Sequence, residues 1–132
     1  MLLDEVHNYL AGLSPTLGLI VKGTMPATPD VCLSLFEYGG APANMGFNVA
    51  GVQHEMPGLQ VVTRGAPEDY VEPRNRIERA YQALAKIQGS TVQGTQYLMV
   101  KPQQAVFLLD RDESKRVRFV VNFLCEKEPS AA

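Results

Sequence analysis

Two stretches of the chain repeat apolar residues at the three- and four-residue spacing of amphipathic helices. The first covers residues 2–13, where Asp4 and Glu5 fall in the first turn and complement the helix dipole. The second covers residues 71–88, and charged side chains fill the rest of its surface. Its apolar face consists of Ile77, Ala80, Tyr81, Leu84 and Ile87. We predict one helix in each stretch.

The remaining periodic segments alternate like strands or are short apolar runs. They are residues 19–22, 31–38, 59–64, 91–93, 96–101, 105–110 and 116–125. Gly94 and Thr95 fit a two-residue hairpin turn between two of them.

The order of these segments is not the strict strand–helix alternation of a parallel sheet. It predicts an α+β fold with a mixed or mainly antiparallel sheet of about five to six strands and two helices packed on one face. Residues 1–126 should form one domain, and residues 127–132 should form a short disordered tail.

Residues 39–57 show no sustained period and hold four Gly, two Pro and two Asn. Such a segment is longer than the usual connection of about four to six residues, which predicts a functional loop. The glycines also suggest that this loop is flexible. Its apolar residues are Met45, Phe47, Val49, Val52 and Met56.

The final strand also carries apolar residues, Val120 and Leu124, on the face that should be exposed to solvent. Either the loop folds back over the sheet, or these residues dock against another chain. The sequence leaves both explanations open.

Composition narrows the class of protein. The 132 residues carry a formal charge of −2 with a pI near 5.6, which gives no global attraction to nucleic acid or anionic membrane. No apolar run approaches the roughly 18 to 20 residues of a membrane span. The acidic start of the chain is unlike a signal peptide, so we expect synthesis in a cytoplasm, with Cys32 and Cys125 as buried thiols rather than a disulfide.

Catalytic and metal-binding patterns are weak. His7 and His54 have no Cys or carboxylate at metal-ligand spacing, and no nucleophile, phosphate or dinucleotide motif occurs. Asp110, Asp112 and Glu113 alternate with basic residues, which is typical of a solvated turn. We therefore expect no enzyme activity, metal or cofactor.

Arg74, Arg76 and Arg79 cluster at the start of the second predicted helix. A solvated helix face explains them, and so does a contact with an acidic neighbouring subunit or with phosphates. Glu72 and Glu78 dilute the cluster and weaken the phosphate explanation.

The order of several short segments resembles a family of tailed-phage proteins, the minor capsid or tail-terminator (tail-completion) proteins. The likeness covers nearly the whole chain, although each segment is only a turn and a strand. The segments are residues 38–40, 57–61, 94–98, 108–113 and 119–123, with the second predicted helix between the second and third.

This resemblance implies an α+β domain that forms a ring, commonly of six copies, on the head-proximal end of the tail tube. The ring would end tube polymerisation and offer a surface to the head–tail connector, with DNA passing through without specific binding. Its implied partners are further copies of the chain, the tail tube protein and the connector or stopper protein. The residues we assign to the assembly interface are Met45, Phe47, Val49, Val52, Met56, Arg74, Arg76, Arg79, Asp112 and Glu113.

Two other functions remain compatible with the sequence. A head-completion or stopper protein is a small ring former at the same junction. A small-molecule or peptide-binding module would use residues 39–57 as a lid over an apolar pocket. An enzyme built on residues 110–113 is the weakest interpretation.

Overall fold

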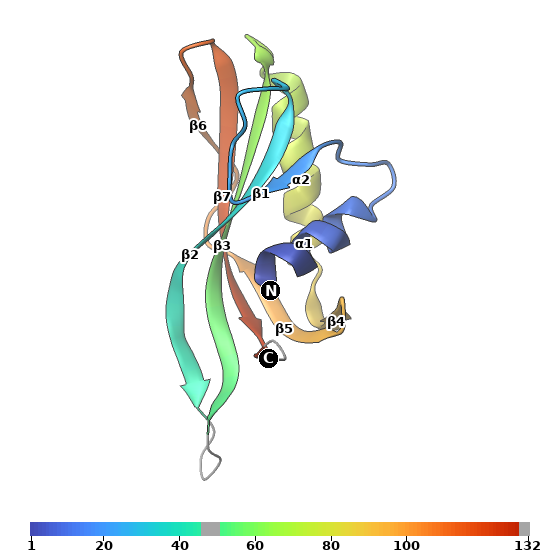
Figure 1. Cartoon of the computed structure of the whole chain (residues 1–132), viewed down its shortest axis with the longest axis vertical. Helices are drawn as coiled ribbons and strands as arrows, with labels where there is room; N and C mark the ends of the chain where they lie inside the picture. Colours follow the sequence, from blue (N-terminus) through green and yellow to red (C-terminus); the bar gives the residue numbers. More distant parts are fainter. Residues whose placement is uncertain (46–50, 130–132) are drawn as a thin grey trace.

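The computed structural model describes residues 1–45 and 51–129, which form two helices and seven strands (Figure 1). In chain order they are α1 (Leu2–Ala11), β1 (Ile20–Lys22), β2 (Cys32–Met45), β3 (Val52–Pro67), α2 (Val71–Ala85), β4 (Gln88–Val92), β5 (Thr95–Pro102), β6 (Phe107–Arg111) and β7 (Arg116–Lys127).

All seven strands join one mixed sheet in the order β1-β2-β3-β7-β5-β4, with β6 paired to β7 beside this path. Only β1 with β2 is a parallel pair among these neighbours. The sheet is larger than the five to six strands predicted, because the long strand β7 carries two partners in succession on one edge. Its first half pairs with β6 and its second half with β5. The α+β class is correct.

Both helices contribute to the same hydrophobic core as the sheet. Leu10 of α1 and Ile77 and Leu84 of α2 are fully buried in it, together with strand residues such as Val61 and Phe119. Both helices end two or three residues earlier than predicted. Gly12 caps α1, and after α2 the chain turns at Lys86 so that the Ile87 carbonyl can accept a hydrogen bond from Val100 in the sheet.

The hairpin between β4 and β5 turns one residue earlier than predicted. Gln93 and Gly94 both have positive φ angles, 50° and 84°, while Thr95 already pairs with Val92. Two central residues with positive φ match the twist of a two-stranded ribbon, which explains why this pair forms the turn.

A buried charge network holds α1 to the end of the sheet. Lys127, predicted to begin a disordered tail, instead ends β7 and is 1% exposed, with its ammonium 3.4 Å from a Glu5 carboxylate oxygen. Glu5 also accepts hydrogen bonds from Thr95 and, at 2.8 Å, from Tyr97. Burial opposes the ionisation of Glu5, but these hydrogen bonds and the Lys127 charge outweigh it and lower the pKa of Glu5.

Replacing Glu5 with Gln should therefore destabilise the protein by roughly 3 kcal/mol at pH 7, because the buried Lys127 ammonium would lose its nearer carboxylate and keep Glu55 only at 4.0 Å. The pH dependence follows from the lowered pKa. The ionised Glu5 carboxylate contributes its full stabilisation above about pH 4.3, the ordinary glutamate pKa. This contribution is lost as the pH falls through the lowered pKa of Glu5 in the folded protein.

Urea denaturation between pH 7 and pH 3 measures both effects. The Glu5→Gln variant should lose stability less steeply in acid than the parent protein. Asp4→Asn is the matched control, because Asp4 lies on the same helix and its ion pair with Lys22 is exposed. If the free energy of unfolding of Glu5→Gln fell as steeply between pH 5 and pH 3 as that of the parent, this account would be contradicted.

Candidate assembly surfaces

Most of the segment predicted as a loop, residues 39–57, is a β-hairpin arm formed by the end of β2 and the start of β3. The described part of this arm extends beyond the body of the domain (Figure 1). Met45 and Val52 are direct cross-strand partners and are 59% and 41% exposed. Met56 is half-buried opposite Ala41, whereas Phe47 and Val49 lie outside the described residues.

The loop prediction was wrong because the arm is irregular. The β2–β3 register shifts between Tyr38 and Ala41, between Ala41 and Asn44, and again before Met45. Each shift breaks the two-residue alternation by which a strand is recognised in sequence.

Two glycines at the base of the arm allow close packing. A Cβ atom on Gly40 would lie 1.9 Å from the Met56 carbonyl oxygen, and one on Gly58 would lie 2.4 Å from the Tyr38 ring. The Tyr38 hydroxyl donates a 3.0 Å hydrogen bond to the Phe123 carbonyl on β7. These contacts clamp the base of the arm, so these two glycines serve close approach rather than the flexibility that the sequence suggested.

The sequence left open what covers the second face of the sheet, and the structure places residues 23–30 over part of it. Val62 and Val120, cross-strand neighbours on this face, are 3% and 1% exposed. Residues 23–30 lie over its edge, where the Met25 sulfur is 3.3 Å from the Cys32 thiol. The described part of the arm therefore does not fold back as this cover.

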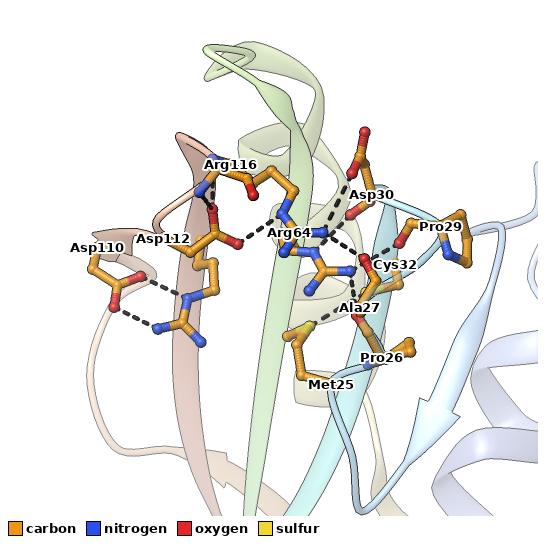
Figure 2. A network of polar contacts seen from close by, with 12 residues as sticks. Met25, Pro26, Ala27, Pro29, Asp30, Cys32, Arg64, Asp110, Asp112 and Arg116 are labelled. Carbon is orange, nitrogen blue, oxygen red and sulfur yellow. Dashed lines mark hydrogen bonds and ion pairs between the residues drawn. The ribbon is translucent and has the colours of Figure 1, made fainter.

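Arg64 fastens this covering segment (Figure 2). The side chain is 2% exposed and donates hydrogen bonds to the carbonyls of Asp30 at 2.8 Å, Pro26 at 2.5 Å and Pro29 at 2.8 Å. A planar guanidinium can satisfy several carbonyls at once. Sequence reasoning missed this role, because nothing in the spacing links Arg64 to a proline-rich segment more than thirty residues earlier.

The predicted turn between β6 and β7 is held by its own charges (Figure 2). Asp112 accepts hydrogen bonds from the backbone of Ser114 at 3.0 Å and Arg116 at 2.9 Å, and from the Arg116 side chain at 2.7 Å. Burial raises the pKa of Asp112, but these hydrogen bonds outweigh it and lower the pKa overall. Asp112 thus shapes the turn, while Glu113 is exposed at its tip.

The arginines of α2 largely have partners within the chain. Arg74 pairs with Glu78 at 2.9 Å, and Arg76 pairs with Glu72. Arg79 donates to the carbonyls of Pro15 and Thr16, which ties the segment after α1 to α2. Intrachain pairing leaves less charge to attract an acidic partner or phosphates. No hydrogen bond or ion pair among the described residues joins these three arginines to the arm or to the β6–β7 turn, although the Glu68 backbone just before α2 donates a 2.9 Å hydrogen bond to the Lys115 carbonyl in that turn.

A further surface was not recognised in the sequence. Phe107, Leu108 and Leu109 are consecutive in β6 and are 43%, 42% and 44% exposed. The apolar pattern predicted their strand, but nothing in it indicated that this strand would lie at the edge of the sheet.

Three features of the described residues bear on other functions: possible metal ligands, membrane-spanning helices and ligand clefts. Residues 1–45 and 51–129 contain no group of three or more His, Cys, Asp or Glu residues placed to hold a metal ion. Neither of the two helices in this part of the chain is long and apolar enough to cross a membrane. A cleft of about 320 Å³ lies between α2 and the segment after α1, with Thr16, Arg76 and Arg79 in its wall, and no described residue of 39–57 lines it.

Solved structures of other proteins show the same fold. A solved structure of the virion of a native gene transfer agent particle superposes with a TM-score of 0.69 at 10% sequence identity, covering 97% of this chain and 95% of that chain. A second solved structure superposes with a TM-score of 0.59 at 11% identity, covering 98% and 92%. A search of curated proteins finds no match.

The fold is thus similar to that of a chain in a virion particle. The family model of bacteriophage tail terminator proteins matches residues 6–129, so the chain belongs to that family. It is thus a structural tail protein with a place in the virion. Membership also indicates a structural role rather than an enzymatic one.

The clamp at the base of the arm can be tested with neighbouring glycines. Gly40→Ala should destabilise the protein by about 1–3 kcal/mol, because its methyl group would overlap the Met56 carbonyl. Gly39→Ala should change stability by less than about 0.5 kcal/mol, because a methyl group there would meet no atom within 4 Å. Denaturant titration distinguishes them, and equal effects would show that no clamp exists.

A conservative substitution can test whether the hydrogen bonds of Arg64 hold residues 23–30 against the sheet. Arg64→Lys should cost roughly 2–4 kcal/mol, because the donors of an ammonium all sit on one nitrogen and cannot reproduce the planar, spread geometry with which Arg64 Nε and Nη2 reach three carbonyls. The control Arg118→Lys, at a more exposed pair with Asp110, should cost less than about 1 kcal/mol. Cys32 should also react faster with a thiol reagent in Arg64→Lys. Unchanged reactivity would mean that Arg64 does not hold residues 23–30 in place.

Proposed function

We propose that this chain forms a ring on the head-proximal end of a phage tail tube, ends tube polymerisation and presents a docking surface to the head. Family membership supports the terminator role. The observation that carries the proposal further is the β-hairpin arm, which exposes Met45 and Val52 on a base clamped by Gly40 and Gly58.

An exposed apolar pair on an extended arm is unfavourable in water, so it favours contact with another protein. The clamped base reduces the entropy lost when the arm docks, because its base is already ordered. We infer that the arm contacts a neighbouring copy or the last ring of tail tube protein, and we keep Phe47 and Val49, which lie outside the described residues, as candidates for the same contact.

A ring requires heterologous contacts, in which one face of each copy meets a different face of the next. We propose six copies, as in the family resemblance, with the tail tube protein on one side and the connector or stopper protein on the other. Arg74, Arg76, Arg79 and Glu113 are secondary candidates for these contacts, and Asp112 would act only by shaping its turn.

A mildly acidic chain suits a channel through which DNA must pass without binding. Synthesis in the cytoplasm of the bacterial host, followed by incorporation at the head-proximal end of the tail, completes the proposal.

The arm can be tested with Met45→Asp and Val52→Asp, alone and together. Each single variant places one charge at an exposed position, so stability should change by less than about 0.5 kcal/mol while tube capping is lost. The double variant places two like charges directly opposite each other and should lose up to about 1 kcal/mol more. Leu98→Asp is the control, because Leu98 is also exposed, at 37%, but lies on β5.

The measurement is the length distribution of tubes assembled with each variant, together with electron microscopy of their ends. The parent protein and Leu98→Asp should give short tubes capped by rings. If the double variant caps tubes as well as the parent, the arm does not make the terminating contact. If the parent protein never caps tubes, the terminator proposal itself fails.

A further inference from the structure

Strand β6 presents an unusual edge. Three of its five residues are large and apolar, and all three are more than 40% exposed: Phe107, Leu108 and Leu109. Within the part of the chain that the structure describes, β6 pairs only with β7, so its other edge faces outward. Proteins usually protect such an edge with charges, proline or a covering segment, because it can pair with another strand.

Asp110 does not protect this edge. It forms a two-hydrogen-bond pair with Arg118 of β7, which directs the charge of its carboxylate back toward the sheet. The apolar part of β6 is therefore open to a partner, and an apolar partner strand fits it best.

The same sheet has a second free edge at β1. Cross-strand pairing connects the two edges through three central strands. One row runs in order through Ile20, Leu33, Thr63, Phe119 and Leu108. The next row runs through Val21, Ser34, Val62, Val120 and Phe107. Residues of β1 and β6 thus lie at opposite ends of the same rows.

The directions of the strands are also compatible. β1 runs parallel to β2, and each later step along the row, from β2 to β3, β7 and β6, is antiparallel. β6 therefore runs opposite to β1. If a second copy is placed beside the first in the same orientation, its β1 would meet β6 in antiparallel fashion, which two edge strands can form directly.

We propose that β6 of one copy pairs with β1 of the neighbouring copy, so that the five-stranded rows continue from subunit to subunit. This inference rests on the proposed ring and names its lateral contact. Leu19, which precedes β1 and is 43% exposed, adds apolar surface that can contact Phe107, Leu108 and Leu109 of β6 in the neighbouring copy. The contact is heterologous, as a closed ring requires.

The dimensions suit a ring. Five strands about 4.8 Å apart give each copy a width of about 24 Å, so six copies would close a sheet roughly 45 Å across. Both edge strands are short, three and five residues, so this contact alone is small. A small lateral contact is consistent with rings that are completed only on the end of a tube.

Disulfide trapping tests the pairing directly. The double variants combine Val21→Cys with Phe107→Cys, Leu108→Cys or Leu109→Cys. Within one chain, four strand spacings of about 4.8 Å separate the two edges, whereas a disulfide needs Cα atoms within about 7 Å. Any bond between the new cysteines must therefore join two copies. The native Cys32 and Cys125 are buried, and burial raises the pKa of Cys125 to about 12, so neither should compete.

We expect at least one double variant, oxidised on tube ends, to give a ladder of covalent oligomers that stops at the ring size. Mixing two single variants of that pair should give dimers only. The control combines Val21→Cys with Leu98→Cys on β5, which should stay monomeric under the same oxidation.

The outcomes separate the two proposals. If rings cap the tubes but none of the three double variants links copies more than the control does, the β6–β1 contact is wrong and the terminator function stands. If no rings form in any preparation, the proposed function fails, and the lateral contact fails with it.

Discussion

The antiparallel pairing of β3 with β7 supports every other part of this structure. It runs from Glu55 opposite Lys127 to Pro67 opposite Arg116, along nearly the full length of both strands. The far edge of β3 carries β2 and the arm, and the far edge of β7 carries β5 and β6. A slip of one residue would turn Val61 and Phe119 out of the core, so the register is fixed by burial.

Two buried cations mark the places where the sheet is joined to the rest of the chain. Arg64 holds residues 23–30 on one face through carbonyl oxygens, and Lys127 joins the end of β7 to α1 through Glu5. Buried charges add little net stability, but they penalise any arrangement in which they lack partners. They therefore specify where these connecting segments lie more than they strengthen the core.

The sequence predicted the helices and strands in which the burial of one face requires a regular spacing of apolar residues. Ile77 and Leu84 predicted the start and the buried face of α2, and alternating residues predicted the central strands, because one face of each packs against the core. The arm was not recognised, because its bulges and close-packed Gly40 remove the alternation. The burial of Lys127 and the role of Arg64 depend on partners distant in sequence, Glu5 and the carbonyls of residues 26–30. The exposure of Phe107 to Leu109 depends on strand order, which periodicity does not encode.

The Tyr38 hydroxyl bond to Phe123 has a mechanical consequence. It crosses from β2 over Gly58 of β3 to β7, so the base of the arm is fixed to three strands at once. An arm fixed in this way cannot pivot freely at its base. A load applied to the described part of the arm, at Met45 or Val52, is therefore transmitted to β7, the strand that also supports β6. A contact made by the arm and strain at the β6 side of the subunit are thus mechanically linked through the Tyr38–Phe123 hydrogen bond.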